Sequence, residues 1–448
     1  MYGLRSAYIL PAVALVAFTT ATAAIAQPEA KLSSIVRFKT PGSAPEIIAA
    51  SRDGNRIVYV NSKENDIGFV NIQDPSKPKM LGVVSVANVG EPTSVAITPD
   101  AKYAIVSIFV KEKPGQLLFF NMSDRKQVAS LNLPGIGPDS IAITPDGKKL
   151  VVAIEDEENT DKLPGKRPGT VAIITLDYNN PSKSSIQNIA INLKGISGVN
   201  FPTDPQPEYV AISPDSKMAA VTLQENNAIA LIDIKSASVT RIFSARTVTQ
   251  LADLSDDDKA SLTEKFTSRR EPDGIAFTAD GLFLVTANEG DTERKTFGDN
   301  VYSGGRGWTI FDLQGAVVYE SGNSVEAIAI KNSFYPLKRS SKRGIELEGA
   351  VISVVDDKQV AFLTSERGNF LLAYDVSSIR MPVLLGVVPT GKNPEGLVVI
   401  PSRNLVLTAN EGVQSISLRS SHRYSNVSFA QDIKPKRWQS KALPSFEF

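Results

Sequence analysis

A repeated phrase constrains the fold of this chain more than any other feature of its sequence. Each copy joins a proline, usually followed by an acidic residue, to an alternating apolar stretch, a Pro-Asp-Gly-like turn and a second apolar run. The phrase is clearest in "PDSIAITPDGKKLVVAI", "PEYVAISPDSKMAAVTL" and "PDGIAFTADGLFLVTAN". The seven copies begin at Pro45, Pro92, Pro138, Pro207, Pro272, Leu347 and Pro394. Self-similarity at a period of about 45 residues or more, built from strands, predicts a β-propeller.

Each copy is long enough for a four-stranded antiparallel blade, so we predict an all-β, seven-bladed propeller. The last copy supplies only three strands and ends with "VQSISL" at residues 413–418. The N-terminal segment "SSIVRFKT" leads into Pro45-Glu46 as "PVLLGVVPT" leads into Pro394-Glu395. We therefore expect this N-terminal segment to be the outer strand of the last blade, which would close the ring and pair its free edges.

The first 26 residues resemble an export signal. Arg5 supplies a positive charge, residues 9–18 are mostly apolar, and Ala24-Ile25-Ala26 has the small-x-small pattern of a cleavage site. We expect cleavage after Ala26 and a periplasmic or secreted protein, with an uncleaved N-terminal anchor as the alternative. No later segment is long and apolar enough to cross a bilayer, so the mature chain is expected to have no transmembrane segment.

The remaining chain divides into a propeller over residues 31–420 and a polar C-terminal extension over residues 421–448. Residues 246–270 interrupt the repeat, and "LSDDDKASLTEKF" within them combines a capping Ser255, early acids and helical apolar spacing. These signals predict a short helix between the fourth and fifth blades. A second insertion, residues 333–346, contains the basic sequence "LKRSSKRG" and is expected to be a loop.

Composition excludes several classes of function. Lys+Arg and Asp+Glu both number 48, so the chain lacks the basic excess that nucleic-acid or anionic-membrane binding requires. There is no cysteine and a single histidine, His422. These counts exclude thiolate catalysis and argue against a Ser-His-Asp triad or a multi-histidine metal site. Any catalysis would need metal-activated water with a carboxylate base.

Acidic residues occur at two stations of the repeat that a propeller brings to the same face. The station before the inner strand holds Glu46, Asp139, Glu208, Asp273, Glu348 and Glu395. The station after the second strand holds Glu64, Glu155, Glu225, Glu289, Glu366 and Glu411. The second copy has Thr93 at the first station and no acid at the second. We expect these carboxylates to crowd around one mouth of the ring.

Crowded carboxylates repel one another, raise one another's pKa or recruit cations, and oxygen ligands suit hard ions such as calcium and magnesium. We predict Ca²⁺ or another hard divalent cation at this mouth, bound within the last four copies. The candidate metal ligands are Glu208, Asp273, Glu289, Glu348, Glu366, Glu395 and Glu411. In the alternative interpretation, the acids accept hydrogen bonds from backbone amides of neighbouring blades and set the blade register.

Three arginines are candidates for binding a substrate or ligand near these acids: Arg294, Arg306 and Arg367. A guanidinium beside a metal ion matches the oxygens of a phosphate or carboxylate group. Each arginine could instead pair with an adjacent acid at the surface.

Several segments also identify a known family. "PQPEYVAISPDSKMAAVTLQENNAIALIDI", "REPDGIAFTADGLFLVTANEGDTE", "GGRGWTIFDLQGAVVYESG", "RGIELEGAVI" and "NPEGLVVIPSRNLVLTANEG" together resemble the choice-of-anchor I family of secreted β-propellers. The resemblance extends over most of residues 35–418, and the first three copies have a more general YVTN-like character. It implies a propeller fold and export, and it implies no particular reaction.

Two classes of function follow. In the first, a monomeric extracytoplasmic propeller binds a divalent cation and a small-molecule or extracellular ligand on its acidic face, as a non-catalytic binding or scaffold protein. In the second, the same face is a calcium-dependent phosphoesterase, phytase-like or alkaline-phosphatase-like, or a lactonase. Acids such as Asp273, Glu289, Glu348 and Glu366 would hold the metal-activated water. The catalytic residues of such an enzyme are not identified by the sequence.

Overall fold

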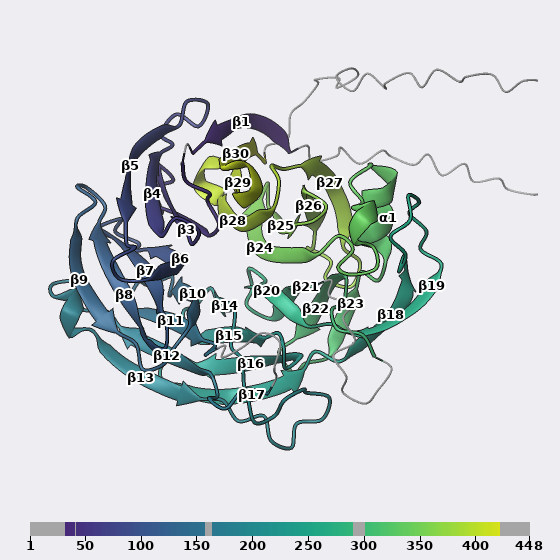
Figure 1. Cartoon of the computed structure of the whole chain (residues 1–448), viewed down its shortest axis with the longest axis horizontal. Helices are drawn as coiled ribbons and strands as arrows, with labels where there is room; N and C mark the ends of the chain where they lie inside the picture. Colours follow the sequence, from purple (N-terminus) through teal and green to yellow (C-terminus); the bar gives the residue numbers. More distant parts are fainter. Residues whose placement is uncertain (1–31, 41, 157–163, 290–300, 422–448) are drawn as a thin grey trace, which may run out of the picture.

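The computed structural model describes residues 32–40, 42–156, 164–289 and 301–421, which form a seven-bladed β-propeller (Figure 1). Each blade is a four-stranded antiparallel sheet. In every blade but the last, the chain runs outward from the strand nearest the axis to the strand at the rim (Figure 1). The predicted all-β, seven-bladed architecture is confirmed.

The strands of the first three blades follow chain order. Blade one contains β2 (Ile48–Ala50), β3 (Arg56–Asn61), β4 (Asp66–Asn71) and β5 (Lys79–Ser85). Blade two contains β6 (Glu91–Ile97), β7 (Tyr103–Val110), β8 (Lys113–Asn121) and β9 (Gln127–Asn132). Blade three contains β10 (Pro138–Ile143), β11 (Lys149–Ile154), β12 (Thr170–Thr175) and β13 (Ser185–Ala190).

Blades four to six repeat this order, with a two-stranded hairpin inserted between blades four and five. Blade four contains β14 (Val210–Ile212), β15 (Met218–Leu223), β16 (Ala228–Asp233) and β17 (Ser238–Ser244). Blade five contains β20 (Pro272–Phe277), β21 (Phe283–Asn288), β22 (Gly307–Asp312) and β23 (Val317–Glu320). Blade six contains β24 (Leu347–Val355), β25 (Lys358–Ser365), β26 (Phe370–Asp375) and β27 (Val383–Pro389).

The seventh blade joins the two ends of the described chain. It contains β28 (Pro394–Ile400), β29 (Leu405–Asn410), β30 (Ser415–Ser420) and, as its outer strand, β1 (Ser33–Lys39). β1 runs antiparallel to β30, with Phe38 opposite Ile416 and Val36 opposite Leu418. The prediction that the N-terminal segment closes the ring is therefore confirmed. Closure pairs strand edges that would otherwise be open to association with other chains.

The apolar core lies between neighbouring blades. Between blades three and four, Val151 and Ile173 pack with Val210 and Val221, and all four are buried. Each such side chain contributes roughly 1.5–3 kcal/mol by leaving water. This arrangement explains why the second and third strands of each copy are nearly continuous apolar runs, because both of their faces contact a neighbouring blade.

The Pro-Asp-Gly-like turn of the first five copies is a hydrogen-bonded unit. In blade three, Thr144 Oγ1 donates to Asp146 Oδ1 over 2.7 Å, and the same Asp146 oxygen accepts from the Lys148 amide over 3.0 Å. Gly147 follows with φ of 74°, a conformation that glycine adopts without steric cost. Equivalent Ser/Thr-to-Asp bonds recur at Ser51, Thr98, Ser213 and Thr278. The most regular part of the sequence repeat is thus a side-chain-capped turn.

The prediction of a helix between blades four and five is wrong. The insertion is a hairpin of β18 (Thr247–Ala252) and β19 (Glu264–Arg269). Asp253 accepts hydrogen bonds from the amide and hydroxyl of Ser255, at 3.1 and 3.0 Å, and from the Ser261 amide at 3.3 Å. These side-chain bonds hold the acidic segment as a turn, in competition with helix formation.

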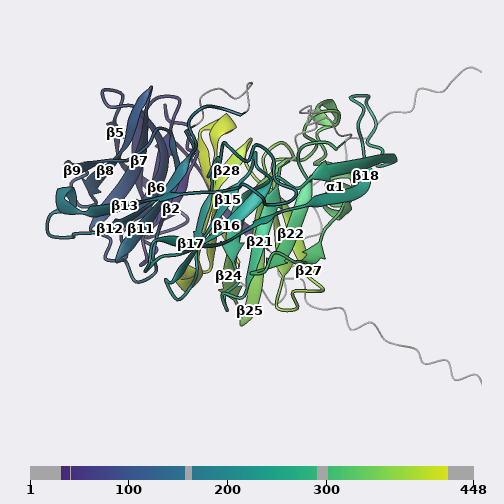
Figure 2. The same cartoon turned by 90° about the horizontal axis from the view of Figure 1, so that it is seen from below.

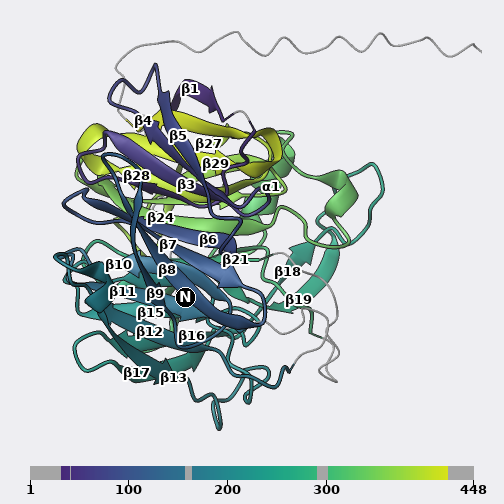
Figure 3. The same ribbon diagram turned by 60° about the vertical axis from the view of Figure 1, so that its left-hand side comes forward.

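The α-helix of the described chain lies elsewhere, at α1 (Ser324–Lys331), after β23. Four short 3-10 helices are η1 (Pro181–Lys183), η2 (Leu337–Arg339), η3 (Pro401–Arg403) and η4 (Glu411–Val413). Figures 2 and 3 show α1 and the β18–β19 hairpin projecting on the same side of the ring.

Within the described chain, we find no helix with the length and apolar character needed to span a membrane. The predicted signal, its cleavage after Ala26 and almost all of the C-terminal extension lie outside the described residues.

Candidate functional site

The acidic residue at the start of each inner strand is positioned by an irregularity in strand pairing. In blade five, Pro272 pairs with Asn288 but Ile275 pairs with Thr286, so one residue of β20 is extra. Asp273 lies in this bulge. Comparable shifts occur in blades three, six and seven across Asp139, Glu348 and Glu395. A bulge redirects a side chain from the ordinary alternation of a strand, and here it accompanies carboxylates that face the axis.

Two glycines that follow these acids allow the inner strands to approach closely. A Cβ on Gly274 would lie 2.2 Å from the backbone oxygen of Glu348 in the next blade. A Cβ on Gly396 would lie 2.2 Å from the backbone oxygen of Glu46, across the junction of blades seven and one. The Pro-acid-Gly pattern therefore combines an axial carboxylate with tight packing of one blade against the next.

The carboxylates of the first station meet in one cavity on the axis, which we call the axial cavity. Its volume is about 360 Å³. Seven acidic residues line it: Glu46, Glu91, Asp139, Glu208, Asp273, Glu348 and Glu395. The described residues around the cavity also include Ser62, Thr93 and Tyr209, and they include no lysine or arginine. All six acids predicted at the first station are thus brought together.

Burial and mutual repulsion raise the pKa of the axial carboxyls. Burial is the main cause for Glu208, whose pKa is raised well above its usual range, and the charge of Asp273 adds to the effect. The pKa of Asp273 is raised in the same way, by burial and then by Glu289. Burial, assisted by Glu46 and Glu411, raises the pKa of Glu395 to about 8.

Hydrogen bonds offset little of this cost. Glu208 Oε2 is buried and has no hydrogen-bond partner among the described residues. Glu46 is better satisfied, because it accepts from the Ser62 hydroxyl over 2.5 Å and from the Ser62 amide over 3.1 Å. The pKa of Glu46 is nevertheless raised, mainly by burial. Backbone capping of the axial acids, the alternative to cation binding, is therefore visible in blade one and absent at Glu208 Oε2 in the described structure.

A second group of acids, two from the second station and Glu346 from the segment before β24, is paired with arginine. We call Glu289, Glu346, Glu366, Arg343 and Arg367 the rim cluster. Arg367 Nε donates to Glu346 Oε2 over 2.5 Å, and its Nη1 lies 2.6 Å from Glu366 Oε1. Arg343 Nη1 pairs with both Glu289 and Glu346. Glu346 is fully buried, so its two arginine partners are what make its charge tolerable.

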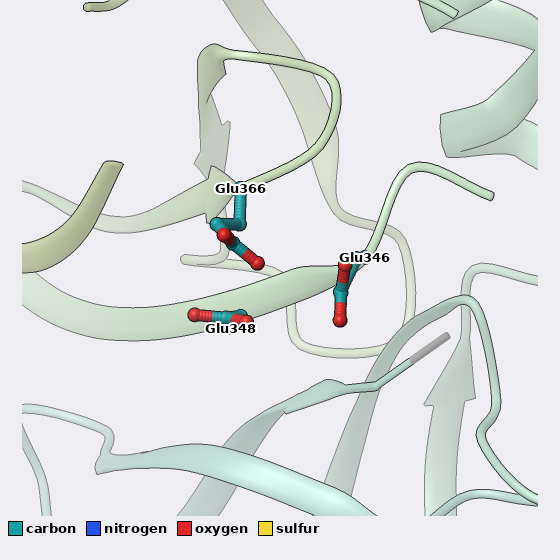
Figure 4. Close-up of side chains that lie close together, drawn as sticks. All are labelled: Glu346, Glu348 and Glu366. Atoms are coloured by element: carbon teal, nitrogen blue, oxygen red, sulfur yellow. The ribbon is translucent and has the colours of Figure 1, made fainter. Parts of the chain in front are cut away.

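Figure 4 shows Glu346, Glu348 and Glu366 close together. Glu346 precedes β24, Glu348 lies within it and Glu366 follows β25, and one oxygen of each lies within 4.8 Å of the others. Three carboxylates at this spacing could hold a metal ion. Glu366 also accepts from Asn393 Nδ2 over 2.6 Å. Of the three, Glu348 is the one that also lines the axial cavity.

The other acids of the second station do not gather with the first. Glu64 is exposed, whereas Glu155 and Glu225 are half-buried, and none of them is among the residues that line the axial cavity. Glu411, in η4, does not line it either, although its charge raises the pKa of Glu395. The two stations therefore face the same side of the ring but form two chemically different groups.

The three candidate arginines have three different positions. Arg294 lies outside the described residues. Arg306 has an exposed fraction of 0% and donates to the backbone oxygens of Asp253 and Ser340 over 3.0 and 2.5 Å. Its Nη1 also lies 3.5 Å from Glu326 of α1. Arg306 thus joins the hairpin loop, the loop after α1 and α1 itself, and this placement does not fit the expected substrate-binding role. Arg367 belongs to the rim cluster.

Comparison with known proteins identifies the family. The sequence matches the choice-of-anchor I domain over residues 46–303 and 296–379, together more than half of the chain. The chain belongs to the choice-of-anchor I family. Membership favours an extracellular binding or scaffold role, and it confirms the resemblance seen in the sequence. A search of the curated proteins found no match to this choice-of-anchor I propeller.

Among solved structures, the choice-of-anchor I propeller is similar to Kuenenia stuttgartiensis Hydrazine Synthase. The two share 17% sequence identity with a TM-score of 0.58, over 85% of this chain and 96% of the other. Similarity at this level of sequence identity shows the fold alone and gives no information about chemistry.

Sequence reasoning missed two acids of the choice-of-anchor I propeller. Glu91 lines the axial cavity from blade two, where the expected station held Thr93. Glu346 is the buried centre of the rim cluster. A signal existed for both: Glu91 directly precedes Pro92, as Glu271 precedes Pro272, and Glu346 is separated by one residue from Glu348.

Proposed function

We propose that this protein is an extracytoplasmic, non-catalytic binding propeller whose axial cavity holds a hard divalent cation, calcium in the first instance. The ligand would then be a molecule with oxygen groups that complete the coordination of the cation. One observation carries the proposal: seven carboxylates line a cavity of about 360 Å³ in which the described residues provide no positive side chain. Oxygen-rich, flexible sites of this kind suit calcium.

The electrostatics supply the driving force. At neutral pH, the raised pKa of Glu208, Asp273 and Glu395 means that ionising these groups together is costly in the folded protein. A bound dication removes that cost, because an opposite charge nearby favours the ionised form. Binding would therefore release protons and would strengthen as the pH rises.

The same geometry favours binding over phosphoester hydrolysis. Holding a phosphate group beside a metal ion calls for a guanidinium or ammonium group facing the site. In the described structure, Arg343 and Arg367 are engaged with carboxylates of the rim cluster, and Arg306 is buried away from the axial cavity. The calcium-dependent hydrolase remains the second candidate, and activity assays distinguish the two.

The decisive experiment measures thermal stability with and without calcium. Protein comprising residues 27–448 is stripped with a chelator and dialysed, and its melting temperature is then followed during titration with CaCl₂, MgCl₂ and, as a control, NaCl. At a free calcium concentration about 100-fold above Kd, we expect stabilisation of about 2.7 kcal/mol and a rise of about 3 °C. No shift with either divalent cation would refute the proposal.

Matched variants locate the site. The double change Glu208→Gln and Asp273→Asn should abolish the calcium-dependent shift, whereas Glu64→Gln, at an exposed acid outside the cavity, should preserve it. Hydrolysis of p-nitrophenyl phosphate, phytate and a simple lactone is measured on the same samples. Calcium-dependent turnover that is lost in the double variant would overturn the non-catalytic assignment in favour of the hydrolase.

A further inference from the structure

A second concave site, distinct from the axial cavity, lies beside blade four. We call it the blade-four groove, and its volume is about 900 Å³. It is bounded by the connection from β13 to β14, by the end of β17 and by the β18–β19 hairpin. Figure 1 shows β17 and the hairpin at the outer edge of the ring. This volume lies in the upper part of the range, roughly 300–1,000 Å³, typical of small-molecule sites.

The lining of the blade-four groove combines apolar residues with neutral polar residues and two arginines. Ile196, Val199 and Phe201 contribute from the connection between blades three and four, and Ile242 and Phe243 contribute from β17. Arg246 and Arg269 supply two positive charges. The described lining residues include no aspartate or glutamate, in contrast to the axial cavity.

Arg246 is held in an unusual position by its backbone. Its φ is 62°, in the left-handed region that arginine rarely occupies. Its amide donates to Ser244 Oγ over 3.0 Å, and its carbonyl accepts from Asn227 Nδ2 and from the Arg270 amide, both over 3.2 Å. The side chain is exposed and forms no ion pair within the described chain. The backbone is thus fixed while the guanidinium is available to an anion.

Arg269 differs in being buried. Its Nη1 donates to the Val301 carbonyl over 3.4 Å, and its exposed fraction is 7%. Arg246, in contrast, presents an accessible fork of donors to the groove. A guanidinium fork matches the two oxygens of a carboxylate, while the apolar wall favours a hydrocarbon body.

We propose that the blade-four groove binds a small organic carboxylate with an apolar body, with the carboxylate on Arg246. The probes are octanoate and 4-phenylbutyrate, measured by isothermal titration calorimetry on the residue 27–448 protein. Acetate lacks the apolar body and octylammonium has the opposite charge. We expect both to bind at least tenfold more weakly than octanoate. Equal binding of octanoate and octylammonium would overturn the proposal.

Variants test the role of Arg246 without disturbing its backbone. Arg246→Asn suits the left-handed conformation and should weaken octanoate binding about tenfold, as expected for loss of one charge-assisted contact. Arg241→Asn, at an exposed arginine of β17 outside the groove, should change it less than twofold. Val199→Asp places a negative charge in the wall and should abolish binding. Unchanged affinity in both Arg246→Asn and Val199→Asp would refute the site.

The two sites are separable by experiment. Octanoate binding should persist after chelation and in the Glu208→Gln, Asp273→Asn double variant, because neither residue lines the blade-four groove. Loss of octanoate binding on chelation alone would show that the groove depends on the cation and would overturn its independence. Far-UV circular dichroism of every variant confirms that the propeller is intact.

Discussion

The axial cavity and the rim cluster are both built from acids at the mouth of the same ring, yet they handle negative charge in opposite ways. In the rim cluster, Arg343 and Arg367 pair with Glu289, Glu346 and Glu366. In the axial cavity, seven acids have no lysine or arginine among the described lining residues. Two arginines of the chain offset most of the negative charge of the rim cluster, whereas no described lining residue offsets that of the axial cavity.

This difference separates structural acids from acids available for binding. A buried carboxylate with internal partners stabilises the fold, because removing one member leaves the others uncompensated. A carboxylate without such partners has a raised pKa, unless an external cation binds and compensates its charge. Glu348, which lies within 4.8 Å of Glu346 and Glu366 and also lines the axial cavity, marks the boundary between the two groups.

Glu346→Gln should produce the largest effect and tests the structural side of the comparison. The change leaves Arg343 and Arg367 without their shared buried partner, so we expect the free energy of unfolding to fall by about 3 kcal/mol, the lower end of the range for breaking a buried pair. Both arginines are about one third exposed, at 33% and 30%, which limits the loss. Urea denaturation measures this decrease in the free energy of unfolding.

The matched control is Lys338→Gln, which removes a pair with Asp258 whose side chains are 71% and 85% exposed. Such a surface pair should contribute less than about 1 kcal/mol. A loss for Glu346→Gln no larger than that of the control would show that the rim cluster does not depend on its buried carboxylate.

The pH dependence of stability should distinguish the axial cavity. Glu395 binds its proton more tightly in the folded than in the unfolded chain, because its pKa is raised from 4.5 to about 8. The stability that this group contributes is therefore fully present below about pH 4.5 and is lost as the pH rises toward 8. We expect the metal-free protein to lose about 2 kcal/mol over this window, after allowance for partial exposure.

Urea titrations at pH 5, 6, 7 and 8 measure this loss, and saturating calcium should abolish most of it. The Glu395→Gln variant is the control, since it removes one of the titrating groups and should reduce the loss. A metal-free protein whose stability is flat or rises between pH 5 and 8 would contradict the assignment of the axial acids as unneutralised.

Glu208→Gln provides the sharpest contrast with Glu346→Gln, because the same chemical change should alter the free energy of unfolding in the opposite direction. Burial and Asp273 raise the pKa of Glu208, so replacing its carboxyl with an amide should stabilise the metal-free protein by about 1 kcal/mol at pH 8. The same change should weaken calcium binding. Destabilisation of the metal-free protein at pH 8 would place Glu208 with the structural acids.

The sequence predicted the fold more completely than the site. Five of the seven copies begin with a Pro-acid pair, and the first five contain a capped turn such as Thr144-Pro145-Asp146, so the repeat specifies local structure through residues that are near in sequence. Closure of the ring by β1 was predicted because the segment that leads into Pro45-Glu46 resembles the segment that leads into Pro394-Glu395. The hairpin of residues 247–269 was misjudged because Asp253 bonds its own neighbours, an interaction that periodicity does not reveal.

At the site, regular spacing predicted the convergence of six axial acids but not how they are neutralised. Arg343, which pairs with Glu289, comes from the insertion before β24, and no repeat encodes that segment. Arg306 became buried for the same reason, through contacts with Ser340 and Asp253. The repeat determines where the acidic residues lie on the backbone. Arginines from the insertions determine which of these acids are paired within the chain and which can bind an external cation.

Glu64→Gln should have the smallest effect and tests whether position in the repeat or position in space determines function. Glu64 occupies the second station of blade one, as Glu366 does in blade six, but it is exposed and lies outside the axial cavity. We expect its loss to change the free energy of unfolding by less than about 0.5 kcal/mol and to leave calcium affinity unchanged. Urea denaturation and calorimetric titration measure both. A clear loss of calcium affinity would mean that the cation site extends beyond the axial carboxylates to the second station, and the separation of the two groups of acids would fail.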